Sequence, residues 1–143
     1  MRFMIIVKAD KDSEAGVMPD EQLVSDMAAY HEALHKAGML VDGSGLQPSA
    51  KGWRIRYSGA RRSVVDGPFP ETKELIAGYT IIRAGSRQEA LEWTRRFPNP
   101  AIGGKDCEIE VRQLFELEDF EPSFGMKPEV VQRFREIGIG GKD

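Results

Sequence analysis

An unbroken apolar run near the start of the chain constrains the fold most. Phe3 to Val7 are five consecutive apolar residues, and charged residues follow them. This pattern predicts a β-strand. Successive side chains of a strand point to opposite faces, so both faces of this strand must be covered. A second run, Gly78 to Arg83, is also apolar on both faces. We therefore expect a sheet that needs a cover on each side.

A helix is predicted between these two runs, after a polar loop at residues 12–18. Pro19 suits the first helical position, and Gly38 suits the left-handed residue that ends a helix. Residues 39–41 can then continue briefly as a strand. One stripe of the helix is apolar, with spacings of four, three and four residues between its members: Leu23, Met27, Tyr30 and Leu34.

The remaining elements complete an α+β pattern. Residues 53–57 and 62–65 flank a Ser-Gly turn and predict a hairpin. Ser86 to Glu89 matches a capping box and predicts a helix that ends at Pro98. Residues 108–117 predict the last strand. The order is β-α-β-β-β-α-β with a mainly antiparallel sheet.

The length of 143 residues suits one compact domain. The single cysteine, Cys107, cannot form an internal disulfide, and the opening apolar run is too short for a signal peptide or a membrane span. We expect a cytoplasmic protein without a membrane partner. We assign residues 1–120 to the domain and residues 121–143 to a C-terminal extension. The extension contains a short amphipathic helix with Val130, Val131, Phe134 and Ile137.

The stretch from Asp66 to Glu74, Asp-Gly-Pro-Phe-Pro-Glu-Thr-Lys-Glu, is the most distinctive motif. Its two prolines remove donors from the ladder, so the motif must end a strand. The stiff Gly-Pro backbone gives the Asp66 carboxylate a fixed direction, which suits a general base or a group that orients a substrate hydroxyl or amine. Alternatively, Asp66 accepts hydrogen bonds from the amides of its own turn. Spacing alone leaves both interpretations open.

This stretch resembles the signature of the DGPF-domain branch of the YCII-related protein family. The resemblance spans roughly residues 1–120 and includes the opening strand, the helix end at residues 36–38, the continuation to Leu75, and residues 107–115. It implies a ferredoxin-like subunit that pairs with a second copy as a dimeric α+β barrel. DGPF-type proteins are often encoded beside extracytoplasmic-function sigma factors, which implies a sensing or transcription-linked role.

Better-understood relatives in this family are similar to small enzymes that use a His–Asp pair, with the histidine near the start of the first helix. In this chain Glu21, Gln22 and Leu23 occupy that region, and His31 lies further along. The pair is therefore not carried over. The sequence leaves open whether the protein is an enzyme.

His31 and His35 lie in the run His-Glu-Ala-Leu-His, which matches the zinc-protease pattern H-E-x-x-H. At about 100° per residue, His31 lies about 60° and His35 about 100° from the centre of the apolar stripe. We therefore expect His35 to face solvent. The chain has no third histidine, so we interpret the match as accidental and predict no metal. His31, at the edge of the buried face, is either a pocket residue or a packed one.

Basic residues are concentrated between positions 43 and 65, where the chain has no acidic residue. They can form an anion site with bidentate guanidinium geometry, or protect an exposed hairpin edge against aggregation. Trp53 and Tyr57 are the aromatic residues among them, and the net charge of the chain is −3. We therefore do not predict a nucleic-acid partner. The basic residues are Lys51, Arg54, Arg56, Arg61 and Arg62.

Two functions from different classes remain. The first is a small-molecule-binding protein, with catalysis left open, whose cleft lies between the sheet and the first long helix. Its candidate ligand-binding residues are Asp66, His31, Arg54 and Lys73. The second is a regulatory or interaction protein linked to transcription. The chain has no P-loop, dinucleotide-binding glycine pattern or nucleophile elbow. We therefore predict no cofactor and assign no catalytic residue.

The predicted sheet also indicates a homodimer. Two helices cover only one face of a sheet in this topology. Three or four large apolar side chains left in water would each cost on the order of 1.5–3 kcal/mol relative to burial. A two-fold partner is the commonest cover for such a face. We expect Ile82 to point outward into this interface.

Overall fold

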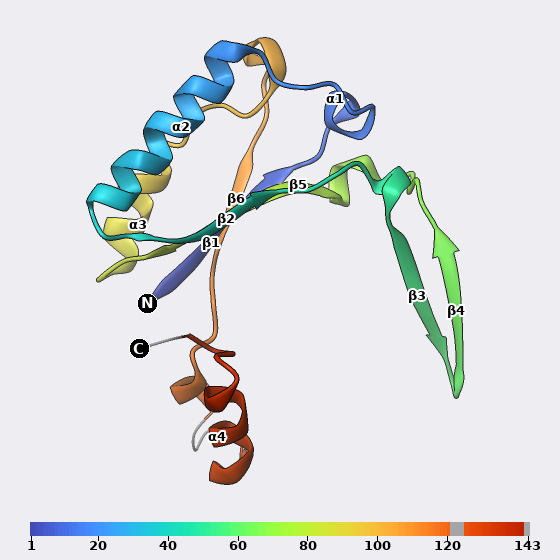
Figure 1. The fold of residues 1–143 in the computed structure, drawn as a ribbon, viewed down its shortest axis with the longest axis vertical. Helices are drawn as coiled ribbons and strands as arrows, with labels where there is room; N and C mark the ends of the chain where they lie inside the picture. Colours follow the sequence, from blue (N-terminus) through green and yellow to red (C-terminus); the bar gives the residue numbers. More distant parts are fainter. Residues whose placement is uncertain (121–124, 142–143) are drawn as a thin grey trace.

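The computed structural model describes residues 1–120 and 125–141. Its main sheet has four strands, and all neighbouring strands are antiparallel (Figure 1). Both apolar runs that we predicted as strands form the centre of this sheet, where burial on two faces is most demanding. In spatial order the strands are β2 (Leu40–Gly45), β5 (Ile76–Arg83), β1 (Arg2–Lys8) and β6 (Ile109–Gln113).

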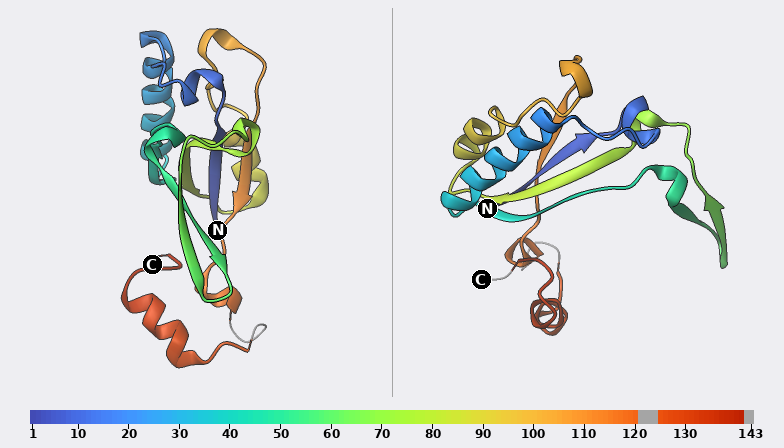
Figure 2. Two further views of the ribbon diagram at one scale, coloured as in Figure 1. Left: turned by 90° about the vertical axis from the view of Figure 1, so that its right-hand side faces the viewer. Right: turned by 45° about the horizontal axis from the view of Figure 1, so that its top comes forward.

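Two helices, α2 (Glu21–Lys36) and α3 (Arg87–Thr94), cover one face of the main sheet (Figures 1 and 2). The side chain of Asp20 caps α2 by accepting a hydrogen bond from the amide of Leu23 at 2.8 Å. Pro19 therefore precedes the cap instead of occupying the first helical position. The helix ends before Gly38, whose φ of +72° matches the expected left-handed stop.

A short helix, α1 (Lys11–Glu14), occupies part of the stretch that we expected to be a loop. Asp10 caps it: its carboxylate accepts from the amide of Ser13, and the Ser13 hydroxyl accepts from the amide of Asp10, each at 2.8 Å. A capping box built from Asp and Ser does not follow the Ser/Thr-to-Glu/Gln pattern, so the sequence signal was weak.

The core lies between the main sheet and the two helices. Ile5, Leu34 and Ile82 are fully buried there. The expectation that Ile82 points outward is wrong, because it pairs with Phe3 and shares the helix-covered face. Burial raises the pKa of Tyr30 to about 12, so its hydroxyl stays protonated and donates to the carbonyl of Trp93 at 2.8 Å.

The opposite face of the main sheet, which we call the open face, is left uncovered by α2 and α3 (Figure 2). Strand alternation puts Met4 and Ile6 on this face. Their partners across the ladder are Ile81 and Tyr79. All four side chains are partly exposed. The prediction that both faces of the central strands carry large apolar side chains is therefore confirmed.

A hairpin of β3 (Trp53–Ser58) and β4 (Arg61–Asp66) forms a separate two-stranded sheet that projects from the body (Figures 1 and 2). We expected these strands in the main sheet, but β2 pairs with β5 there instead. Without the hairpin, the main unit has the connectivity β-α-β-β-α-β, consistent with a ferredoxin-like fold.

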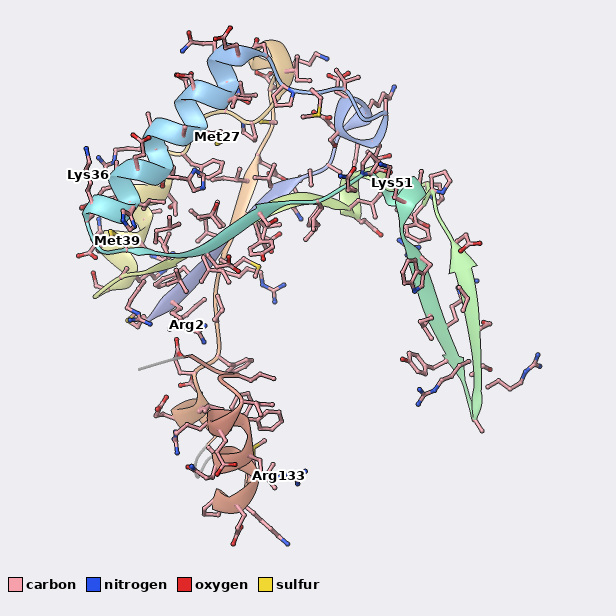
Figure 3. All side chains as sticks on the ribbon, in the orientation of Figure 1. Arg2, Met27, Lys36, Met39, Lys51 and Arg133 are labelled. Atoms are coloured by element: carbon pink, nitrogen blue, oxygen red, sulfur yellow. The ribbon has the colours of Figure 1, made fainter. Side chains whose placement is uncertain are left out.

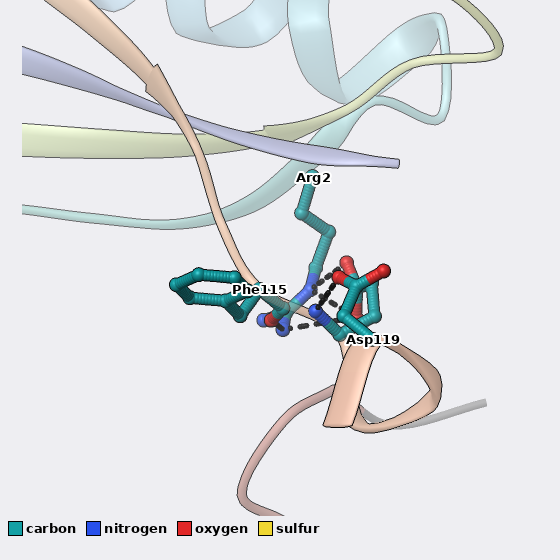
Figure 4. Close-up of polar contacts among 4 residues, drawn as sticks. Arg2, Phe115 and Asp119 are labelled. Atoms are coloured by element: carbon teal, nitrogen blue, oxygen red, sulfur yellow. Dashed lines mark hydrogen bonds and ion pairs between the residues drawn. The ribbon is translucent and has the colours of Figure 1, made fainter. Parts of the chain in front are cut away.

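The chain continues after β6 into a small C-terminal cluster, in which the 3-10 helix η4 (Leu117–Phe120) packs on α4 (Pro128–Glu136). Leu117 and Val131 are buried. Figure 4 shows how the cluster is tied to β1: Arg2 Nε donates to Glu116 Oε1 at 2.9 Å. The predicted link at residues 121–127 lies partly outside the described residues. Within residues 1–120 and 125–141, no helix is long and apolar enough to cross a membrane.

Candidate functional site

A cleft of about 1160 Å³ opens between the N-terminal half of α2 and the main sheet. Leu23 and Met27 line it from the helix, and Figure 3 labels Met27 at this position on α2. Phe97, which follows α3, contributes an aromatic wall. Only the C-terminal half of α2 sits tightly on the sheet, where Tyr30 and Leu34 are buried, whereas Leu23 and Met27 remain partly exposed. The cleft is therefore the space under the end of the helix that does not reach the core.

Glycines on the floor of the cleft explain this space. Gly45 of β2 and Gly78 of β5 lie opposite each other in the ladder, on the face that α2 covers, and both line the cleft. A side chain at either position would project toward the helix, so their absence keeps the space open. The backbone also approaches closely here: a Cβ on Gly78 would lie 3.0 Å from the carbonyl oxygen of Ser44.

One hydrogen-bonded side-chain pair, His31 and Thr80, lines the cleft. His31 Nδ1 lies 2.7 Å from the carbonyl oxygen of Met27, and His31 Nε2 lies 2.8 Å from Thr80 Oγ1. A carbonyl oxygen only accepts, so Nδ1 must carry a proton. In the neutral ring, Nε2 then accepts the proton of the Thr80 hydroxyl. Thr80 lines the cleft and is buried, and its Oγ1 then keeps lone pairs only, as an acceptor.

His31 is also packed between aromatic rings. Its ring contacts those of Tyr30 and Phe97 edge-on, with centroids 5.7 and 6.2 Å away. Both of our interpretations of His31 therefore apply, because the ring is packed and also lines a pocket. His35, the second histidine of the H-E-x-x-H pattern, is exposed, as expected. Among the described residues, no group of three or more His, Cys, Asp and Glu side chains could hold a metal ion.

The other three candidate residues are divided between two places. Lys73, in the 3-10 helix η2 (Thr72–Glu74), lines the cleft. Asp66 and Arg54 lie on the hairpin and are not part of the cleft lining. The Arg54 guanidinium lies 3.8 Å from the centroid of the Phe69 ring and 3.4 Å from the Glu71 carboxylate. The structure thus brings His31 and Lys73 to one cleft and leaves Asp66 and Arg54 outside it.

The Asp-Gly-Pro-Phe motif fastens the hairpin to the body. The Gly67 amide donates to the carbonyl of Gly52, and the Phe69 amide donates to Ser49 Oγ, at 3.0 and 3.1 Å. A Cβ on Gly67 would lie 1.8 Å from the carbonyl oxygen of Ser49, so the turn has no room for a side chain. Glu14 accepts hydrogen bonds from both the amide and the hydroxyl of Ser49, which links this turn to α1.

This attachment involves the 3-10 helix η1 (Ser49–Lys51), and Figure 3 labels Lys51 where the chain enters β3. Within residues 1–120 and 125–141, no hydrogen bond to the Asp66 carboxylate is found. The expectation that Asp66 accepts from the amides of its own turn is therefore not met. The motif contributes to the structure through its glycine and its backbone amides.

Sequence reasoning missed Thr80 and the glycines. The signal for the cleft was present at positions 43, 45 and 78, where glycine replaces side chains on one face of two strands, but glycine in a strand also indicates a bulge or a turn. Cys107 lines the cleft as well, and its Sγ lies 3.0 Å from Asn99 Oδ1. It precedes the 109–113 strand in a loop that includes the 3-10 helix η3 (Ile102–Gly104).

Comparisons with known proteins identify the family. The model of the YCII-related domain matches residues 1–117. Uncharacterized protein R00369 of Rhizobium meliloti (strain 1021) is 35% identical over 97 residues, which cover 66% of this chain and 75% of that protein. A solved structure, the 5-chloro-2-hydroxyhydroquinone dehydrochlorinase TftG of Burkholderia phenoliruptrix AC1100 in complex with 2,5-dihydroxybenzoquinone, is 16% identical. Its TM-score is 0.41, and the match covers 81% of this chain and 95% of that chain. The chain belongs to the family of proteins with a YCII-related domain.

Proposed function

We propose that the protein binds a small, largely apolar molecule in the cleft between α2 and the main sheet. The observation that carries this proposal is a cleft of about 1160 Å³ with apolar walls and one oriented polar pair, His31 and Thr80. Ligand sites typically combine such apolar walls with a few polar groups that fix the orientation of the ligand. The volume lies above the roughly 300–1,000 Å³ that is usual for ligand sites, so the cleft has room for a small organic molecule, and its apolar walls suit one.

The protonation of the pair selects the hydrogen-bonding group of the ligand. With neutral His31, the hydroxyl proton of Thr80 is directed to Nε2, so Thr80 Oγ1 offers only lone pairs to the cleft. A ligand group at this point must therefore be a donor, such as a hydroxyl or an amine. A buried acceptor left without a donor costs about 1–3 kcal/mol, which disfavours ligands that lack one.

Charges around the cleft have both signs. Lys11 and Lys73 line it together with Asp106 and Glu108. Because these charges are mixed, they do not favour an anion or a cation in general. We therefore assign the selection of the ligand to the apolar walls and to Thr80, with Lys73 available to a ligand that carries an additional anionic group.

We also propose that the chain lies in the DGPF branch of the family, on the evidence of its Asp66-Gly67-Pro68-Phe69 run and of the close packing that requires Gly67. The transcription-linked role stays a prediction, since a ligand-binding cleft suits a sensor as well as an enzyme.

Thermal unfolding with matched ligand pairs tests the binding proposal. The probes are phenols and anilines, each compared with the O-methyl or N,N-dimethyl analogue that lacks the donor. We expect members of the donor series to raise the unfolding temperature, with a stabilisation of about 2.7 kcal/mol at about 100 times Kd. The methylated analogues should bind at least about five times more weakly, because they leave the Thr80 acceptor without a donor at a cost of about 1–3 kcal/mol.

Two cleft variants and one control variant locate the effect. Thr80→Val removes the acceptor and should abolish the preference for donors, whereas Thr94→Val, at a buried threonine that donates to the Leu91 carbonyl, should preserve it. Gly45→Leu should place a side chain on the floor of the cleft and weaken binding, and the fold should accommodate it, because a Cβ at Gly45 meets nothing within 4 Å. If no donor probe binds, or if Gly45→Leu and Thr80→Val bind like the natural protein, the proposal is wrong.

A further inference from the structure

The β3–β4 hairpin presents a large apolar surface to solvent. The ladder places three alternate residues of β3 on one face of the hairpin, together with the residue of β4 that pairs with Ile55. We call these residues the arm face; with their exposed fractions they are Trp53 (65%), Ile55 (40%), Tyr57 (68%) and Val64 (65%). An isolated two-stranded hairpin is at best marginally stable in water, and an exposed apolar patch typically marks an interaction surface. The arm face therefore needs a partner.

The position of the hairpin indicates where this partner lies. In Figure 1 the hairpin and α4 extend to the side of the main sheet that faces away from α2 and α3. The open face, with Met4, Ile6, Tyr79 and Ile81, is on the same side. The hairpin and the uncovered apolar face of the main sheet thus lie on the same side of the molecule, and a single partner seated there can contact both.

The charge distribution indicates which partner fits. Residues 43–65 carry five of the 20 basic residues of the chain and none of its 23 acidic residues. The rest of the chain has 15 basic residues against 23 acidic ones and is clearly negative. A basic arm on an acidic body is complementary to another molecule with the same distribution.

The family resemblance already implies that a second copy covers the open face; we propose that the β3–β4 hairpin is an arm that packs against this second copy. In a two-fold dimer each copy gives one arm and receives one, so the same contact is made twice. The arm face is then buried against the partner, and the basic residues of the arm lie near its acidic body. This proposal is independent of the ligand proposed for the cleft.

Nucleic acid fits the hairpin less well. The negative body would repel a phosphate backbone. The guanidinium of Arg54 is already stacked on Phe69 and paired with Glu71, and the guanidinium of Arg62 lies 5.0 Å from the centroid of the Tyr57 ring. These two cations make their contacts within the chain.

The fluorescence of Trp53 tests the proposal directly. The chain has two tryptophans, so Trp93→Phe leaves Trp53 as the reporter. Acrylamide quenching and light scattering are measured on the same dilution series. We expect a mass near twice 16.0 kDa at high concentration, with a blue-shifted Trp53 that is quenched several times less strongly than free tryptophan. Dilution to a mass near 16.0 kDa should expose Trp53 to the quencher.

Hairpin variants separate the arm from the sheet contact. Tyr57→Ser should raise the dimer dissociation constant at least about ten-fold, as expected for an aromatic residue in the centre of an interface. Ser63→Ala, on the opposite face of the hairpin, should leave it within about two-fold. Circular dichroism checks that both variants are folded.

Three results would overturn the proposal. The first is a mass near 16.0 kDa at every concentration up to saturation. The second is a dimer in which Trp53 is quenched as freely as in the dilute protein, which would mean that the copies meet without the arm. The third is protection of Trp53 by duplex DNA at concentrations where the protein is a monomer, which would assign the arm to nucleic acid.

Discussion

The main sheet and the β3–β4 hairpin use the same alternation of side chains but place it in different surroundings. In β1, alternation puts Phe3 and Ile5 beneath α2 and α3, where both are buried. In β3, it puts Trp53 and Tyr57 into solvent. Alternation therefore determines which residues share a face, whereas the neighbouring elements decide whether that face is buried. The body supplies its own cover on one face, and the hairpin supplies none.

The largest expected difference between the two regions is the effect of removing an apolar side chain. Leu34→Ala deletes a fully buried side chain of α2 and should lower the free energy of unfolding by about 2–5 kcal/mol. Val64→Ala, on the exposed hairpin, should change it by no more than about 0.5 kcal/mol in dilute protein. Urea unfolding at low protein concentration measures both. Equal losses would show that the hairpin is covered within a single chain, contrary to our description.

A smaller effect is expected at the junction of the two regions. Gly67→Ala would bring a Cβ into the carbonyl oxygen of Ser49 and should cost about 1–3 kcal/mol, the usual range for overpacking. Gly85→Ala is the matched control, since its Cβ meets nothing within 4 Å, and should be nearly neutral. Urea unfolding again gives both values. If the two variants are equally stable, the motif does not need its glycine for packing. The interpretation of Asp66 as a general base or substrate-orienting group would then be favoured again.

Most of the fold could be predicted because its signals are local. The apolar runs of β1 and β5, the stripe of α2 and the Ser86 cap of α3 each depend on residues close together in the sequence, and each is present in the structure. Strand pairing depends on distant residues. The hairpin was therefore assigned to the wrong sheet, and its turn lies at Gly59 and Ala60, one residue later than the predicted Ser-Gly turn.

The candidate site was predicted less well for the same reason. His31 was found because it lies at the edge of the apolar stripe of α2, a local signal. Its partner Thr80 lies 49 residues away and has no distinctive neighbours, so only the packing of α2 on β5 reveals the pair. Asp66 was selected for a stiff backbone, but that stiffness holds the hairpin to the body and does not direct a carboxylate into the cleft.

In our description, the helices of the chain itself cover the body, and a second copy covers the hairpin. Amide hydrogen exchange measures both kinds of cover in one experiment. It is followed by mass spectrometry at protein concentrations below and above the dimer transition. We predict that peptides from β1 and β5 are protected at both concentrations. Peptides from β3 and β4 should exchange rapidly in dilute protein and become protected when the dimer forms. Protection of the hairpin that does not depend on concentration would mean that a single chain covers its own hairpin, and the arm would then not need a second copy.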